Sequence, residues 1–203
     1  ALGTGLPVYE PQGSFIVDIG GGTTEVALVS MGGVVLSHSV RVAGNKIDEA
    51  IAGFLKKQHA ILVTDRVAEQ IKFDLADVRS ERKMEHIAVV RGRDIATGMP
   101  LTVDVNMAKV SEAIREPIQE ILGAIKWVLG RIPPELCADI LQNGIFLTGG
   151  SAALPNLDTM IATEFGVPVS VARDAGECTT LGAGYMADHF DMLGGIKSEA
   201  KRS

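Results

Sequence analysis

The sequence has few cysteines, few aromatic side chains and no excess of positive charge. Among its 203 residues are two cysteines, Cys137 and Cys178, which form no CxxC pattern. This usage predicts a reduced, cytoplasmic compartment rather than a disulfide-stabilised fold. Aromatic residues make up 4% of the chain, too few for the platforms on which single-stranded nucleic acids stack. Because 25 acidic residues outweigh 19 basic ones, a nucleic-acid partner is not expected.

Membrane and metal-site signals are also missing. No stretch approaches the roughly 20 apolar residues that a membrane-spanning helix needs, and no secretory signal opens the chain. The histidines are scattered without the spacing of zinc ligands or of a nucleophilic triad, at His38, His59, His86 and His189. The chain begins at Ala1 rather than at a methionine, and we expect it to be the middle of something longer.

The sequence contains two glycine-rich turns, each directly after a short apolar run. The first is Asp18-Ile19-Gly20-Gly21-Gly22-Thr23-Thr24-Glu25, and the second is Thr148-Gly149-Gly150-Ser151. Glycine lets a ligand approach the backbone, and successive N–H groups in such a turn form a concave anion site. Threonine hydroxyls would add donors, and Asp18 could hold a hydrated Mg²⁺. Either turn alone is equally compatible with a loop that binds nothing, but together they predict a cleft for nucleotide phosphates.

Apolar periodicity and capping residues predict the secondary structure. We expect strands at 14–18, 24–30, 34–40, 87–91, 101–105, 144–148 and 167–171. Gly32-Gly33 is the expected hairpin turn. We expect helices capped by Asn45, by Thr64 and by Asn106, the last of them long and either kinked or split at Pro117. Further helices are expected at 136–141, 156–165 and 176–188. Gly182 and Gly184 in the last helix suggest close backbone packing, and 77–85 is an exposed, charged connector.

The order of these elements predicts an α/β fold with a mixed five-stranded sheet of ribonuclease-H-like topology. Without residues 45–105, the chain gives three antiparallel strands followed by alternating helices and strands. We therefore expect a core of residues 1–44 and 106–190, a small α/β insertion at 45–105, and a frayed tail at 191–203. Ligands of such sheets bind outside the strand ends, where both glycine turns lie.

Several stretches resemble the C-terminal half of the MreB family, the bacterial actins that determine rod shape. These bacterial actins belong to the actin, Hsp70 and sugar-kinase superfamily. The stretches are GSFIVDIGGGTTEVALVS (13–30), GNKIDEAI (44–51), AEQIK (68–72) and LTGGSAALPNLD (147–158), while GTGLPVYE (3–10) resembles the linker between the two halves. The resemblance covers almost the whole chain. It implies an actin-type fold in which the core is subdomain IIA and the insertion is subdomain IIB.

The resemblance also implies ATP or ADP as ligand, with Mg²⁺. Gly21, Gly22 and Thr23 would donate to the β- and γ-phosphates, and Asp18 would orient Mg²⁺ through water. Glu69 would take the ribose hydroxyls and Lys72 would lie near the adenine. The implied cofactor-binding residues are Asp18, Gly20, Gly21, Gly22, Thr23, Thr24, Glu69, Gln70, Ile71, Lys72, Gly149, Gly150, Ser151 and Ala152. On local spacing alone, Glu69 and Lys72 would instead form a solvated ion pair.

The chain departs from the family pattern in three ways. Ser151 stands where the family often has glycine, and Ala43-Gly44-Asn45 replaces Gly-Gly-Asp. The family's other half carries the first phosphate loop, a lysine and the water-positioning glutamate, so we assign no catalytic residue here. Phosphoryl transfer needs both walls of the cleft, and we expect background ATPase activity and no actin-like protofilament from this chain alone.

The resemblance implies partners and a location for the intact protein. These are its own copies in a filament, the N-terminal half, and the cell-shape and cell-wall synthesis machinery. The intact protein would lie in the cytoplasm at the inner face of the cell membrane, and this half would not insert into it. An apolar face left without the other half could cause this chain to dimerise.

Three other interpretations remain open. The chain could belong to a small-molecule kinase of the same superfamily, or it could be an interaction module that binds no nucleotide. A nuclease with two metal ions would suit Asp18, but Thr148-Gly149-Gly150 ends the fourth strand where a carboxylate is needed.

Overall fold

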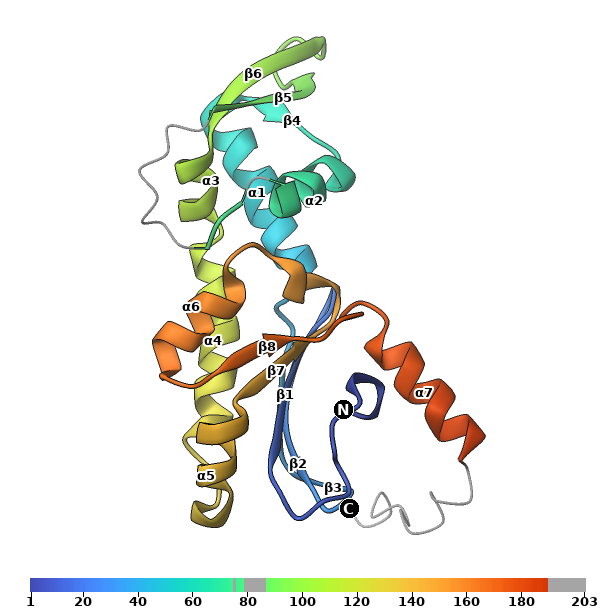
Figure 1. The fold of residues 1–203 in the computed structure, drawn as a ribbon. Coiled ribbons are helices and arrows are strands. Elements are labelled where there is room, and N and C mark those ends of the chain that lie inside the picture. The colour runs from blue at the N-terminus through green and yellow to red at the C-terminus, as the bar shows by residue number, and fades with distance from the viewer. Residues whose placement is uncertain (75, 79–86, 190–203) are drawn as a thin grey trace, which may run out of the picture.

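The computed structural model describes residues 1–74, 76–78 and 87–189 (Figure 1). The strands are β1 (Ser14–Ile19), β2 (Thr24–Ser30), β3 (Gly33–Val40), β4 (Ile61–Leu62), β5 (Ile87–Asp94), β6 (Pro100–Asn106), β7 (Ile145–Thr148) and β8 (Val169–Val171). The α-helices are α1 (Gly44–His59), α2 (Asp65–Asp74), α3 (Met107–Ala113), α4 (Arg115–Leu129), α5 (Pro134–Asn143), α6 (Leu157–Phe165) and α7 (Cys178–Asp188). Two short 3₁₀ helices are η1 (Leu2–Thr4) and η2 (Gly150–Ala153).

The described strands form two sheets. The larger is five-stranded in the order β3-β2-β1-β7-β8, with β1 to β3 antiparallel and with β7 and β8 parallel to β1. This confirms the mixed sheet expected from the sequence. The smaller sheet, β4-β5-β6, is antiparallel and lies at the far end of α1 (Figure 1). Its strand β4 has only two residues and was not predicted.

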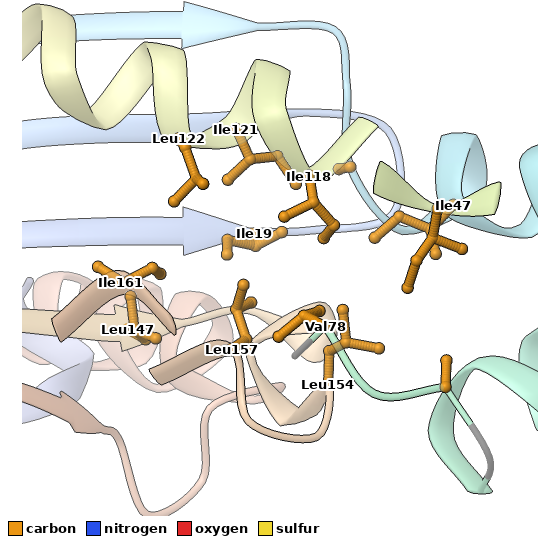
Figure 2. Close-up of a cluster of buried hydrophobic side chains, with 14 of the residues drawn as sticks. Ile19, Ile47, Val78, Ile118, Ile121, Leu122, Leu147, Leu154, Leu157 and Ile161 are labelled. Atoms are coloured by element: carbon orange, nitrogen blue, oxygen red, sulfur yellow. The ribbon is translucent and has the colours of Figure 1, made fainter. Parts of the chain in front are cut away.

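The main core lies between the larger sheet and the helices on one of its faces. Alternate residues of β1, namely Phe15, Val17 and Ile19, are fully buried on this face, as the period of two in a strand requires. Helix α4 packs against them through a stripe at helical spacing, and α6 contributes further apolar residues. Figure 2 shows Ile19 with Ile118 of α4 on one side and Leu157 of α6 on the other. The burial of each such side chain stabilises the folded state by about 1.5–3 kcal/mol.

The long helix expected after Asn106 is split in two. Asn106 caps α3, its Oδ1 accepting a hydrogen bond from the N–H of Ala108 at 2.9 Å, as predicted. The break lies at Ile114. Pro117 falls in the first turn of α4, where backbone N–H groups have no acceptor within the helix, so a residue without an N–H is tolerated there. The predicted cap of α1 is wrong. This helix begins at Gly44, and the N–H of Asn45 instead donates to the carbonyl of Gly21 at 2.8 Å.

The hairpin between β2 and β3 turns one residue earlier than predicted. Met31 and Gly32 have φ of 51° and 74°, and Gly33 already pairs with Ser30. Two-residue hairpin turns of this kind need both central residues at positive φ. The N-terminal segment holds the turn in place, since the N–H of Gly32 donates to the carbonyl of Val8 at 2.7 Å.

Helix α7 and η1 lie on the opposite side of the sheet from α4 (Figure 1). A Cβ on Gly182 would lie 3.0 Å from the nitrogen of Gly3, which confirms the close packing expected of this glycine. The same expectation is wrong for Gly184, which has open space around it. The expected frayed tail at 191–203 and most of the connector at 77–85 lie outside the described residues.

Gly32→Ala should destabilise the chain and Gly33→Ala should not. Alanine at position 32 would be forced to positive φ, at a cost of about 1–2 kcal/mol, and its Cβ would lie 3.1 Å from the Tyr9 ring. A Cβ at position 33 has no neighbour nearer than 3.8 Å. Chemical denaturation measures both variants, and a larger loss at position 33 would contradict the observed turn.

Candidate functional site

The two glycine-rich turns leave the sheet at the same edge. Strands β1 and β7 are neighbours and run parallel, and Asp18 pairs directly with Thr148. Because the carboxyl ends of parallel strands meet at one edge, residues 20–23 and 149–152 lie next to each other. The sequence prediction that both turns lie outside the same strand ends is therefore confirmed by the topology, while the predicted phosphate cleft stays a prediction.

Hydrogen bonds to one carbonyl group join the two turns. The carbonyl oxygen of Gly20 accepts from the hydroxyl of Ser151 at 2.9 Å and from the N–H of Gly44 at 3.1 Å. The N–H of Gly20 donates to the carbonyl of Thr23 at 3.0 Å, which closes the first turn on itself. Ser151 is buried, so the serine that replaces the usual glycine has a structural partner. The first turn is thus held at both ends.

The outer residues of the first turn are open to a ligand. Gly21, Gly22 and Thr23 are exposed, and their N–H groups have no hydrogen-bond acceptor among the described residues. Adjacent unpaired donors in a turn attract an anion. Thr24 differs, because it is fully buried and its hydroxyl donates to the carbonyl of Val42 at 2.6 Å. Its side chain therefore braces the turn from inside.

The second turn can be built only with glycine at position 149. This residue has φ of 86°, and a Cβ there would lie 2.4 Å from both Asp18 Oδ1 and the carbonyl oxygen of Ile19. The N–H of Gly149 donates to the carbonyl of Ala175 at 2.7 Å, and the Thr148 hydroxyl donates to the same oxygen at 3.0 Å. Gly149 therefore shapes the turn, while its own N–H is already used.

Asp18 lies half-buried between the second turn and α7. Its Oδ2 accepts a hydrogen bond from the hydroxyl of Thr179 at 3.1 Å. Thr179 was not predicted, since it is separated from Asp18 by most of the chain and lies in no glycine-rich motif. Within the described residues no group of three His, Cys, Asp or Glu side chains is placed to hold a metal. A single carboxylate still suits Mg²⁺, which usually keeps several waters and takes phosphate oxygens as ligands.

Helix α2 presents its predicted residues on different faces. Glu69 and Gln70 are exposed, whereas Ile71 is buried in the main core. The side chain of Lys72 is 2% exposed, and its Nζ lies 3.0 Å from the Asp48 carboxylate. The solvated Glu69–Lys72 pair expected from spacing is therefore wrong. The true partner lies 24 residues away along the chain, which is why local spacing could not identify it.

All four predicted segments meet at Gly44. A Cβ on this residue would lie 2.4 Å from Ser151 Oγ, 3.3 Å from the Gly20 carbonyl oxygen and 3.3 Å from Lys72 Nζ. Gly44 thus brings α1, α2 and the two turns together. The structure gathers residues from the segments that the resemblance implied, even though Thr24, Gly149 and Ile71 support the site from within.

Two hollows lie beside the smaller sheet. One of about 530 Å³ is lined by Phe54, Asp104 and Lys109 among others, and it contains none of the predicted residues. Another of about 410 Å³ includes Gln70 and Ile71 on the side of α2 that faces β5. Among the described helices none is long and apolar enough to cross a membrane.

The chain matches one known protein family over nearly its whole length. The MreB/Mbl protein family matches residues 1–195. The chain belongs to this family. It is 44% identical over 193 residues to the cell shape-determining protein Mbl of Bacillus subtilis (strain 168), covering 95% of this chain and 58% of that protein. It is 43% identical over 195 residues to the cell shape-determining protein MreB of Escherichia coli (strain K12), covering 96% of this chain and 56% of that protein.

Solved structures have the same actin-like fold. MreB5 of Spiroplasma citri bound to AMPPNP matches with a TM-score of 0.86 at 31% identity, covering 95% of this chain and 57% of that one. The same protein bound to ADP matches with a TM-score of 0.87 at 31% identity, covering 96% and 60%. The predicted fold class is confirmed, and the family is one of cell-shape cytoskeletal proteins. The chain spans a little over half the length of the curated relatives it matches.

Gly149→Ala should unfold or strongly destabilise the chain, unlike Gly150→Ala. At position 149 a methyl group meets backbone and carboxylate oxygens at 2.4 Å, and positive φ adds strain, for a total of at least about 3 kcal/mol. At position 150 a Cβ has no neighbour within 4 Å, and we expect a change below about 1 kcal/mol. Thermal unfolding of the two variants checks this, and equal melting temperatures would contradict it.

Asp48 should titrate above its ordinary pKa of 3.8, because burial disfavours the charged form. Lys72→Met should raise this pKa further, since the ammonium group opposes the shift. Because its pKa is raised, Asp48 binds a proton more readily in the folded parent chain than in the unfolded chain. The contribution of Asp48 to stability is therefore present below pH 3.8 and is lost as the pH rises through the folded-state pKa. Carboxyl NMR measures the midpoint, and a value at or below 3.8 would refute the prediction.

Proposed function

We propose that this chain is the nucleotide-binding second half of an MreB-type bacterial actin. It binds ATP and ADP with Mg²⁺ across the two glycine-rich turns. The observation that carries the proposal is the row of open N–H groups at Gly21, Gly22 and Thr23, fixed beside the second turn by the bond from Ser151 to Gly20. The nucleotides bound by MreB5 of Spiroplasma citri, which has the same fold, support it.

Each part of the nucleotide has a proposed place. The β- and γ-phosphates accept from the N–H groups of the first turn, and Asp18 orients Mg²⁺ through water. Glu69, exposed on α2, takes the ribose hydroxyls, with Gln70 beside it. The adenosine lies along Gly149, Gly150, Ser151 and Ala152, where an exposed Gly150 offers the closest approach.

The activity of the intact protein follows from the family. We propose that it is a weak ATPase that forms cytoskeletal filaments at the inner face of the cell membrane, together with the cell-shape and cell-wall synthesis machinery. The names of the Mbl and MreB relatives support the shape-determining role. For this chain alone we propose neither ATP hydrolysis above background nor normal polymerisation, since transfer of a phosphoryl group needs charge stabilisation from both sides. The boundaries of subdomains IIA and IIB stay a prediction.

The alternatives gain little support. The family match disfavours a small-molecule kinase, and among the described residues no carboxylate cluster serves a two-metal nuclease. An interaction module that binds no nucleotide is the remaining rival, and binding experiments distinguish it.

Gly22→Asp should abolish binding of Mg-ADP by this chain in isothermal titration calorimetry. A Cβ at position 22 has open space, so the variant should fold while placing a carboxylate among the phosphate donors. Gly123→Asp is the matched control, since it adds the same charge at an open, exposed position on α4. Saturable binding by the parent chain and the control, lost in Gly22→Asp, is the expected result. No binding by the parent chain would leave the interaction module as the better description.

A further inference from the structure

The ion pair between Asp48 and Lys72 is buried, unlike the others described. The side chains are 14% and 2% exposed, whereas Lys46–Glu49 and Lys109–Glu112 are exposed pairs within one helix. Removing two charges from water costs several kcal/mol for each ion, and their attraction repays this only partly. The burial of this ion pair between two helices is therefore not explained by a gain in stability alone.

The pair lies at the junction of the two turns. Lys72 Nζ is 3.3 Å from the place a Cβ on Gly44 would take, and the N–H of Gly44 donates to the Gly20 carbonyl. The ammonium group also lies 4.7 Å from the centre of the Phe73 ring. Lys72 therefore ties α2 to α1 directly beneath the first turn.

Two further carboxylates act on Asp48. The charges of Glu69 and Asp65, both on α2, are close enough to act on Asp48. Glu69 is one helical turn before Lys72, a spacing at which a lysine and a glutamate can meet. The structure pairs Lys72 with Asp48 rather than with Glu69.

We propose that Asp48 is a positioning residue of the nucleoside site, which holds Lys72 inward and so leaves the Glu69 carboxylate free for the ribose hydroxyls. The proposal rests on the function proposed above. In Asp48→Asn, the buried ammonium group loses its counter-charge and moves toward water. Glu69 is exposed one helical turn before Lys72, and this pairing competes with the ribose.

Titration calorimetry with Mg-ADP and with Mg-2′,3′-dideoxy-ADP tests the proposal. Asp48→Asn should weaken ADP binding about tenfold, because a hydrogen bond to a charged group contributes about that factor to affinity. The same variant should change the affinity for dideoxy-ADP less than about twofold, since this ligand lacks the ribose hydroxyls. The double variant Asp48→Asn/Lys72→Met removes the competing ammonium group and should recover ADP affinity to within about threefold of the parent chain. Glu49→Gln, an equal charge change at an exposed site on α1, should bind both nucleotides like the parent chain.

The outcomes separate the two proposals. If Asp48→Asn weakens both nucleotides equally, or neither, the positioning role is wrong while nucleotide binding stands. If Lys72 contacts adenine directly, the double variant fails to recover and the inference is overturned. If the parent chain binds neither nucleotide, the proposed function fails and this inference fails with it. Should Asp48→Asn unfold, the double variant still tests the proposal, because ADP binding more than about threefold weaker than in the parent chain would overturn it.

Discussion

The carbonyl group of Gly20 is the contact that joins the two glycine-rich turns. It accepts from the Ser151 hydroxyl of the second turn and from the Gly44 N–H of α1, at 2.9 and 3.1 Å. A carbonyl oxygen has two lone pairs, and both are used. Because this oxygen holds the backbone of the first turn in place, we expect the open N–H groups of Gly21, Gly22 and Thr23 to keep one arrangement. A preorganised set of donors costs little to order when an anion binds.

Helices α1 and α2 are linked to the same point. Gly44 begins α1, which runs from the edge of the larger sheet toward the smaller one (Figure 1). Lys72 of α2 reaches back to Asp48 beside it. The first turn therefore lies within a few ångströms of both α1 and α2. The lack of a Cβ at Gly44 makes this convergence possible, since a methyl group would displace the Ser151 hydroxyl.

The sequence predicted what depends on local patterns. Strand alternation and the order of elements predicted the larger sheet, and the glycine-rich runs predicted both turns at one edge. Contacts between distant residues were not predictable, because neither the Asp48–Lys72 pair nor the Thr179–Asp18 bond has a local signal. The hairpin turn lies one residue earlier than predicted because the N–H groups of Met31 and Gly32 donate to the carbonyls of Glu10 and Val8, which no local turn motif signals. Strand β4 is too short for periodicity to detect.

The proposed function requires that one nucleotide contacts both turns and α2 at once. Backbone amide NMR of this chain, recorded as Mg-ADP is added, measures this. Signals of residues 20–24, 69–72 and 149–152 should shift together with one dissociation constant. Shifts confined to the hollow lined by Phe54 and Asp104, or separate constants for the two turns, would contradict it.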